Sequence, residues 1–116
     1  MSKPVGPYTP IVRAGDWLVV SGQVGAVEGK LVDGGMRGQL EQVLTNLSTL
    51  LEGEGASLQD IVKCTVFLRD MADFAAMNEI YSARFGDHRP ARSAIAVVDL
   101  PLGALVEIEA WAYTGN

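Results

Sequence analysis

The chain has 116 residues, of which 48% are hydrophobic and 20% are charged, and its formal net charge is -5 at pH 7. This length suits one domain with a real core, so residues 1–116 are expected to form a single domain. The acidic balance disfavours nucleic acid as a partner. No apolar run reaches the roughly 20 residues of a membrane span, so no membrane association is expected. A single cysteine, Cys64, excludes an intrachain disulfide and favours a reducing, cytoplasmic setting.

The first predicted element is a strand over 17–24, rich in β-branched and apolar residues. Strict alternation divides its side chains between the two faces of a sheet. Trp17, Val19, Ser21 and Gln23 share one face, and Leu18, Val20, Gly22 and Val24 share the other. The glycine inside this strand is typical of a bulge or of a close approach by a ligand.

A helix and a second strand follow. The predicted helix carries an apolar stripe at helical spacing, formed by Met36, Leu40, Val43, Leu44, Leu47, Leu50 and Leu51. Ser57 and Asp60 have the spacing of a capping box on a single turn. The strand over 61–68 is expected to place Val62, Cys64, Val66 and Leu68 on one apolar face, with Cys64 as inert core.

The third part of the chain contains a second helix and two more strands. The helix stripe consists of Phe74, Met77, Asn78, Tyr81 and Phe85. A strand containing Arg92, a turn at Pro101 and Gly103, and a strand containing Glu107 complete the chain. The order, roughly β-β-α-β-α-β-β, predicts an α+β fold with two helices on one face of a mixed sheet. The other face would be open, and such a face commonly lies against another subunit.

Arg92 is the most informative single residue, because a guanidinium within a strand-like apolar run is costly unless it has a partner or a ligand. Its planar fork matches a carboxylate bidentately, which favours a carboxylate clamp. The alternatives are a structural ion pair with Glu107 or Glu109, or a charge at a strand end that reaches solvent. Taken alone, the residue types favour the structural pair.

Glu107 and Glu109 lie two residues apart on one face of the last predicted strand. They indicate a general base, or a counter-charge for Arg92, or simply an edge strand protected against aggregation by charges. If the last two strands pair across residues 99–104, the Arg92 and Glu107 side chains emerge on the same side.

Other polar residues leave their roles open. Asn78 either bonds to neighbouring backbone or lines a pocket, and Tyr8 is equally consistent with packing and with a lid. His88 is expected in a surface loop. No zinc-ligand spacing, P-loop or dinucleotide motif occurs, so no metal and no cofactor is expected.

Six fragments together resemble the RidA family, which is also called YjgF-type or L-PSP. They occur in the family's order across nearly the whole chain: Gly6-Pro7-Tyr8, Val20-Ser21-Gly22-Gln23, residues 60–67, Asp73-Phe74 with Asn78 and Tyr81, Pro90-Ala91-Arg92-Ser93, and residues 106–110.

The resemblance implies a chorismate-mutase-like α+β fold, with two helices packed on one face of a mixed, six-stranded-type sheet. It also implies a homotrimer with ligand sites in clefts between subunits. The implied activity is hydrolysis of reactive 2-imino or 2-enamino acids to 2-oxo acids and ammonia, without metal or cofactor. A noncatalytic, small-carboxylate-binding regulatory module on the same trimer is the alternative, and ribonuclease activity fits the net charge less well.

By the same resemblance, Arg92 clamps the substrate carboxylate and Glu107 lies beside the attacking water. Tyr8 is supplied across the subunit interface, and Ser21, Gly22 and Asn78 line the cleft. Ala94 stands where many relatives carry cysteine. If the backbone carbonyl at this position does the work, activity survives the change, and if the thiol does, activity is lost.

Overall fold

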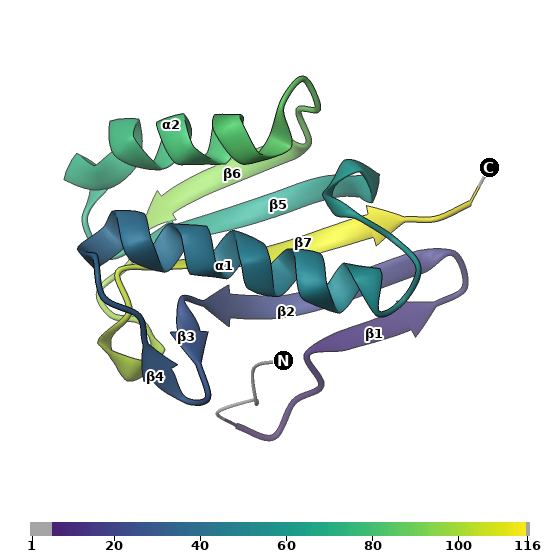
Figure 1. Ribbon diagram of the computed structural model, residues 1–116, viewed down its shortest axis with the longest axis horizontal. Helices are drawn as coiled ribbons and strands as arrows, with labels where there is room; N and C mark the ends of the chain where they lie inside the picture. Colours follow the sequence, from purple (N-terminus) through teal and green to yellow (C-terminus); the bar gives the residue numbers. More distant parts are fainter. Residues whose placement is uncertain (1–5, 116) are drawn as a thin grey trace.

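The computed structural model describes residues 6–115 as a single sheet layer with both helices on one face (Figure 1). The helices are α1 (Gly35–Glu52) and α2 (Phe74–Phe85). The strands are β1 (Ile11–Ala14), β2 (Trp17–Val24), β3 (Ala26–Val27), β4 (Lys30–Leu31), β5 (Ile61–Leu68), β6 (Ala91–Ala96) and β7 (Val106–Tyr113). Short 3₁₀ turns occur at Leu58–Asp60, Met71–Asp73 and Pro101–Gly103.

The main sheet has the strand order β1-β2-β7-β5-β6, and β3 pairs only with β4 in a separate hairpin. β5 and β6 run parallel, whereas the other neighbours in the main sheet run antiparallel. The mixed sheet with two helices on one face confirms the predicted α+β class. Within the described residues the main sheet has five strands rather than the six-stranded type expected.

The last two strands do not meet the condition considered from the sequence, because β5 lies between β6 and β7 and the two strands do not pair. The reason is the connection through α2. A helix that links two neighbouring strands returns the chain to the same end of the sheet, so β6 lies parallel to β5 at the sheet edge. Arg92 is therefore opposite Cys64, and Glu107 is opposite Phe67.

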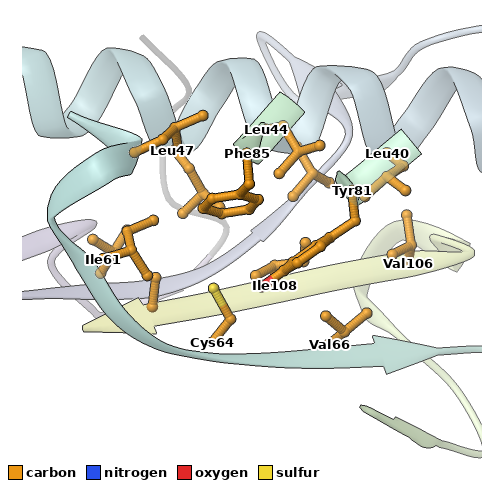
Figure 2. Packing of buried hydrophobic residues seen from close by; sticks show 14 of the residues in the cluster. Leu40, Leu44, Leu47, Ile61, Cys64, Val66, Tyr81, Phe85, Val106 and Ile108 are labelled. Atoms are coloured by element: carbon orange, nitrogen blue, oxygen red, sulfur yellow. The ribbon is translucent and has the colours of Figure 1, made fainter. Parts of the chain in front are cut away.

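The core lies between the helices and the sheet. Every residue of the predicted α1 stripe is buried: Met36, Leu40, Val43, Leu44, Leu47, Leu50 and Leu51. Figure 2 shows the α1 leucines facing Tyr81 and Phe85 of α2 and the inward side chains of β5 and β7. The capping box is also confirmed, since the Ser57 backbone N–H donates to Asp60 Oδ2 at 2.9 Å.

Two bulges overturn part of the predicted alternation. The register shifts between Val20 and Gln23 in β2, and between Ile61 and Lys63 in β5. An extra residue in one strand moves the following side chains to the opposite face. Gln23 is therefore buried with Leu18 and Val20, whereas Val62, expected in the core, is 45% exposed. The glycine signal at Gly22 correctly marked the first of these bulges.

The sheet face away from the helices carries an aromatic cluster formed by Trp17, Trp111 and Tyr113. The Trp17 ring centroid lies 6.4 Å from that of Trp111 and 5.0 Å from that of Tyr113. All three side chains are at least 38% exposed. Exposed aromatic groups that gather on one sheet face are typical of a surface that contacts another protein molecule.

Leu44 tests whether α1 is held by its apolar stripe. Because its side chain is fully buried, Leu44→Ala is expected to lower the free energy of unfolding by about 2–5 kcal/mol. Val98→Ala is the control, since Val98 is 89% exposed and its truncation should change stability by less than about 0.5 kcal/mol. Denaturant unfolding at a fixed protein concentration measures both, and equal effects would contradict this core.

Candidate active site

A pocket of about 260 Å³ opens at the end of the sheet where β2 leads into the β3–β4 hairpin. It brings together four of the predicted site residues: Tyr8, Ser21, Gly22 and Glu107. The remaining wall comes from residues around the bulge and hairpin and from the loop before β7, namely Gln23, Val24, Ala26, Gly29, Pro101 and Leu102.

Glu107 enters this pocket because the β2 bulge and Gly22 leave room for its side chain. A Cβ atom built on Gly22 would overlap Oε2 of Glu107. Any larger residue at position 22 would therefore have to displace the carboxylate. The glycine in the Val20–Gln23 fragment is thus explained by the close approach of a carboxylate from β7, in addition to the bulge.

The protonation of Glu107 is shifted by its surroundings. Burial raises the pKa of its carboxyl above the ordinary value, and the negative charge of Glu109 raises this pKa further. The two acids project from the same face of β7, two residues apart. A carboxylate with a raised pKa is a stronger proton acceptor than an ordinary glutamate once it is ionised.

Ser21 connects the N-terminal segment to the floor of the pocket. Its hydroxyl donates to the Thr9 carbonyl at 2.7 Å, and its backbone N–H donates to the Pro10 carbonyl at 2.9 Å. These two bonds hold the chain next to Tyr8, which is 41% exposed at the rim. Ser21 therefore positions the segment that forms the rim of the pocket. Its hydroxyl proton is donated to the Thr9 carbonyl.

Arg92, Asn78 and Ala94 form a second cluster, under α2 at the sheet edge. Arg92 Nη1 donates to Asn78 Oδ1 at 2.7 Å and lies 3.6 Å from Met77 Sδ. The guanidinium carbon also lies 5.7 Å from the Phe74 ring centroid and 5.0 Å from that of Tyr81. Asn78 thus has a defined partner, and that partner is the functional candidate itself.

No carboxylate neutralises Arg92 within the described part of the chain. Residues 6–115 contain ion pairs from Arg13, Arg37, Arg69 and Arg84, but none from Arg92. The predicted alternative of an ion pair with Glu107 or Glu109 is therefore wrong. A partly buried guanidinium whose contacts are all neutral retains its full charge for an anion that approaches from outside.

The backbone around Arg92 also faces outward. Val97 donates its N–H to the Leu68 carbonyl at 2.8 Å. The backbone N–H and C=O groups of Val97 and of every second residue before it therefore point toward β5. Since alternate residues of a strand direct their N–H and C=O groups to opposite neighbours, Arg92 and Ala94 direct theirs to the open edge of the sheet. The carbonyl of Ala94 therefore lies at the same edge as the Arg92 cluster.

The two clusters lie on different faces of one chain. Ile95 is level with Phe67 and Glu107 across the sheet, and Arg92 precedes Ile95 by three positions. At about 4.8 Å between strands and about 3.3 Å per residue, the two backbone positions are separated by roughly 10 Å in each direction. Arg92 lies beneath α2, whereas Glu107 lies on the open face, so the prediction that they emerge on the same side is wrong.

Residue patterns did not indicate the functional contacts of Leu102, Phe74 and Tyr81. Leu102 adopts a left-handed backbone conformation, φ 62°, at the apolar rim of the pocket. Such a conformation is rare for a residue with a branched side chain, and it clusters at functional loops. The Pro101–Gly103 turn was recognisable, but its contact with the Glu107 pocket depends on the strand order. Phe74 and Tyr81 were assigned only to a helix stripe, although both rings contact Arg92.

Other classes of site find little support in residues 6–115. No group of three or more His, Cys, Asp and Glu side chains there is arranged to hold a metal ion. The same residues include no helix that is long and apolar enough to cross a membrane. Cys64 is buried, and burial raises the pKa of its thiol to about 11, as expected for inert core.

Comparison with known proteins identifies the family of this chain. The model of the endoribonuclease L-PSP family matches residues 1–114. A RutC family protein from Pyrococcus horikoshii is 47% identical over 113 residues, which is 96% of this chain and 90% of that protein. The mouse 2-iminobutanoate/2-iminopropanoate deaminase is 43% identical over 113 residues, 96% of this chain and 84% of its own length.

The solved structure of E. coli TdcF with bound serine superposes with a TM-score of 0.90 at 34% identity. The match covers 97% of this chain and 91% of that one. Sequence and fold therefore agree over almost the whole length, and the chain belongs to the L-PSP family, the family of the RidA and YjgF proteins.

Proposed function

We propose that the protein hydrolyses 2-imino or 2-enamino acids to 2-oxo acids and ammonia. The observation that carries this proposal is the Arg92 guanidinium, which is held by neutral groups and lacks a carboxylate partner among the described residues. A substrate carboxylate supplies the missing counter-charge. The Glu107 pocket then supplies the proton acceptor that hydrolysis of an imine needs.

Arg92 is suited to bind a carboxylate because the surrounding residues use only some of the N–H groups of its guanidinium. Nη1 donates to Asn78, while Nε and Nη2 donate to no side chain among residues 6–115. These are the groups that form the second edge of the guanidinium. An incoming carboxylate can accept from both of them, which fixes the orientation of the substrate as well as its affinity.

Glu107 acts as the base for water. The carboxylate accepts a proton from water as the oxygen adds to the electrophilic imine carbon, which gives a carbinolamine. The proton taken from water passes to the imine nitrogen, which completes the carbinolamine. A second proton then moves from the carbinolamine hydroxyl through the Glu107 carboxylate to the nitrogen, the carbon–nitrogen bond breaks, and ammonia leaves while the carbon–oxygen double bond forms. Water is consumed and the 2-oxo acid is released, so no metal, nucleophilic side chain or redox step is required.

The two half-sites are joined by a second copy of the chain. Arg92 and Glu107 of one chain lie on different faces of the sheet, so one small acid cannot contact both. A homotrimer in which the Arg92 edge of one subunit adjoins the Glu107 pocket of the next would complete the site three times. The exposed Trp17, Trp111 and Tyr113 cluster on the open face offers apolar surface for such an assembly.

Two relatives support this function by what their names state. The mouse relative is named as a deaminase of 2-iminobutanoate and 2-iminopropanoate, which are small imino carboxylates. The E. coli TdcF structure contains bound serine, a small amino carboxylate. Both ligands carry the carboxylate that the Arg92 fork is suited to bind.

A noncatalytic carboxylate-binding module is the second candidate. It is favoured by the serine in the TdcF structure, because serine is bound there without being an imine. Ribonuclease activity has less support, although the family model carries that name. The chain has a net charge of -5, and Arg13, Arg37, Arg69 and Arg84 are each already paired with an acid.

Arg92→Ala is the direct test of the proposed reaction. The substrate is a 2-imino acid generated in situ by an amino-acid oxidase, and the measurement is release of 2-oxo acid above the spontaneous rate. Loss of the charged contact is expected to lower kcat/KM by roughly two orders of magnitude. Arg69→Ala, which removes an exposed arginine paired with Asp99, is the matched control. Wild type that accelerates nothing, or an unchanged rate in Arg92→Ala, would contradict the assignment.

Glu109→Gln tests Glu107 as the base through the pH profile. Glu107 must be ionised to accept a proton, so the acid limb of kcat/KM follows its pKa. Since the charge of Glu109 raises that pKa, its removal should lower the pKa and move the acid limb to lower pH.

The titration of the substrate itself is the same for both enzymes and cancels in the comparison. Glu52→Gln, an exposed substitution at the end of α1, should leave the profile in place. An acid limb that stays fixed or moves to higher pH in Glu109→Gln would argue against Glu107 as the titrating base.

A further inference from the structure

The Tyr81 ring of α2 contacts the Arg92 guanidinium, although Tyr81 lines no part of the Glu107 pocket. The side chain is only 4% exposed, and its ring centroid lies 5.0 Å from the guanidinium carbon. The ring also packs against Phe85, with centroids 4.5 Å apart. Figure 2 shows Tyr81 and Phe85 together in the core. The ring is therefore held in place by core packing while it contacts the guanidinium of Arg92.

The groups that surround the guanidinium all come from one face of α2. Phe74, Met77, Asn78 and Tyr81 follow one another at the three- and four-residue spacings that place side chains in a row on a helix. Two rings, a thioether and an amide oxygen can hold a cation without neutralising it. This neutrality separates the cradle from an ordinary structural ion pair.

We propose that Tyr81 is a positioning residue for the Arg92 clamp, and that it acts through its ring rather than its hydroxyl. The proposal rests on the proposed function, because it assigns the element that holds Arg92 ready for a substrate carboxylate. An arginine on an edge strand has many rotamers, and each must be lost when it binds a ligand. A ring that already selects one orientation removes that loss from the binding step.

The surroundings of the Tyr81 hydroxyl indicate that the ring, and not the hydroxyl, positions Arg92. The Tyr81 hydroxyl is buried, and it interacts with the Cys64 thiol in the core. Burial raises the pKa of Tyr81 and raises that of Cys64 to about 11, so both groups stay protonated at neutral pH. Neither group is placed to transfer a proton to a substrate held by Arg92.

Tyr81→Leu and Tyr81→Phe separate the ring from the hydroxyl. Removing the ring is expected to raise KM for the imino acid about three- to thirty-fold with little change in kcat, because the carboxylate contact persists through the reaction. Tyr81→Phe keeps the ring and should retain the wild-type KM. Phe74→Leu, which removes the partly exposed second ring without opening the core, should raise KM in the same direction.

Two controls distinguish positioning from a general loss of structure. Leu47→Val removes buried volume from α1, so it should lower thermal stability while leaving KM unchanged. In an Arg92→Ala background, Tyr81→Leu should have no further effect on kcat/KM, because the ring acts only through Arg92.

Calorimetric titration with 2-oxobutanoate repeats the comparison without turnover. Its affinity should fall in Tyr81→Leu and remain in Tyr81→Phe. Wild type that binds 2-oxobutanoate but hydrolyses no imine would overturn the proposed reaction and leave the role of Tyr81 standing. An unchanged affinity and KM in folded Tyr81→Leu, an equal loss in Tyr81→Phe, or no 2-oxobutanoate binding by wild type would overturn the role of Tyr81.

Discussion

A positive charge held entirely by neutral groups is the constraint on which the rest of the site depends. Arg92 contacts an amide oxygen, a thioether and two rings, and within residues 6–115 it has no acidic partner. Such an arrangement sacrifices the stability that an ion pair would add, while the helix keeps the guanidinium in place. A carboxylate from solution then meets a charge that is already oriented and only partly hydrated. The same arrangement would be of little use in a purely structural edge strand.

The topology of the sheet separates the proposed Arg92 clamp from Glu107 within one chain. The α2 crossover puts β6 at the edge and inserts β5 between Arg92 and the strand that carries Glu107. The bulge at Ser21 and Gly22 makes room for Glu107 on the open face, while the Ser21 hydrogen bonds hold the segment with Tyr8 at the rim. One chain thus presents the Arg92 guanidinium at a sheet edge and the Glu107 carboxylate in a pocket, on different faces. A closed ring of subunits brings such unlike surfaces together repeatedly.

Residue patterns predicted where helices and strands form better than they predicted which strands lie side by side. The leucines of α1 and the strand Ile61–Leu68 follow from periodicity, because burial against a core forces apolar residues into helical or alternating spacing. Strand order has no such local signal. A pairing of the last two strands, which would have put Arg92 and Glu107 on one side, therefore could not be judged from the sequence, and it does not occur. Single-residue bulges caused the errors at Gln23 and Val62, since one extra residue inverts every later side chain. The residue types alone favoured an ion pair for Arg92. The fold shows that Glu107 and Glu109 lie on the sheet face opposite to the one that carries the Arg92 side chain.

Mixing two defective variants tests the shared site most directly. Arg92→Ala retains the Glu107 pocket, and Glu107→Gln retains the Arg92 clamp, so each alone should be nearly inactive. If every site takes Arg92 from one subunit and Glu107 from the next, random reassembly of equal amounts restores about one quarter of the sites. The expected result is recovery of about one quarter of wild-type imine hydrolysis per subunit after the two are unfolded and refolded together. Mixed oligomers that form but remain as inactive as the separate variants would contradict a site built between subunits.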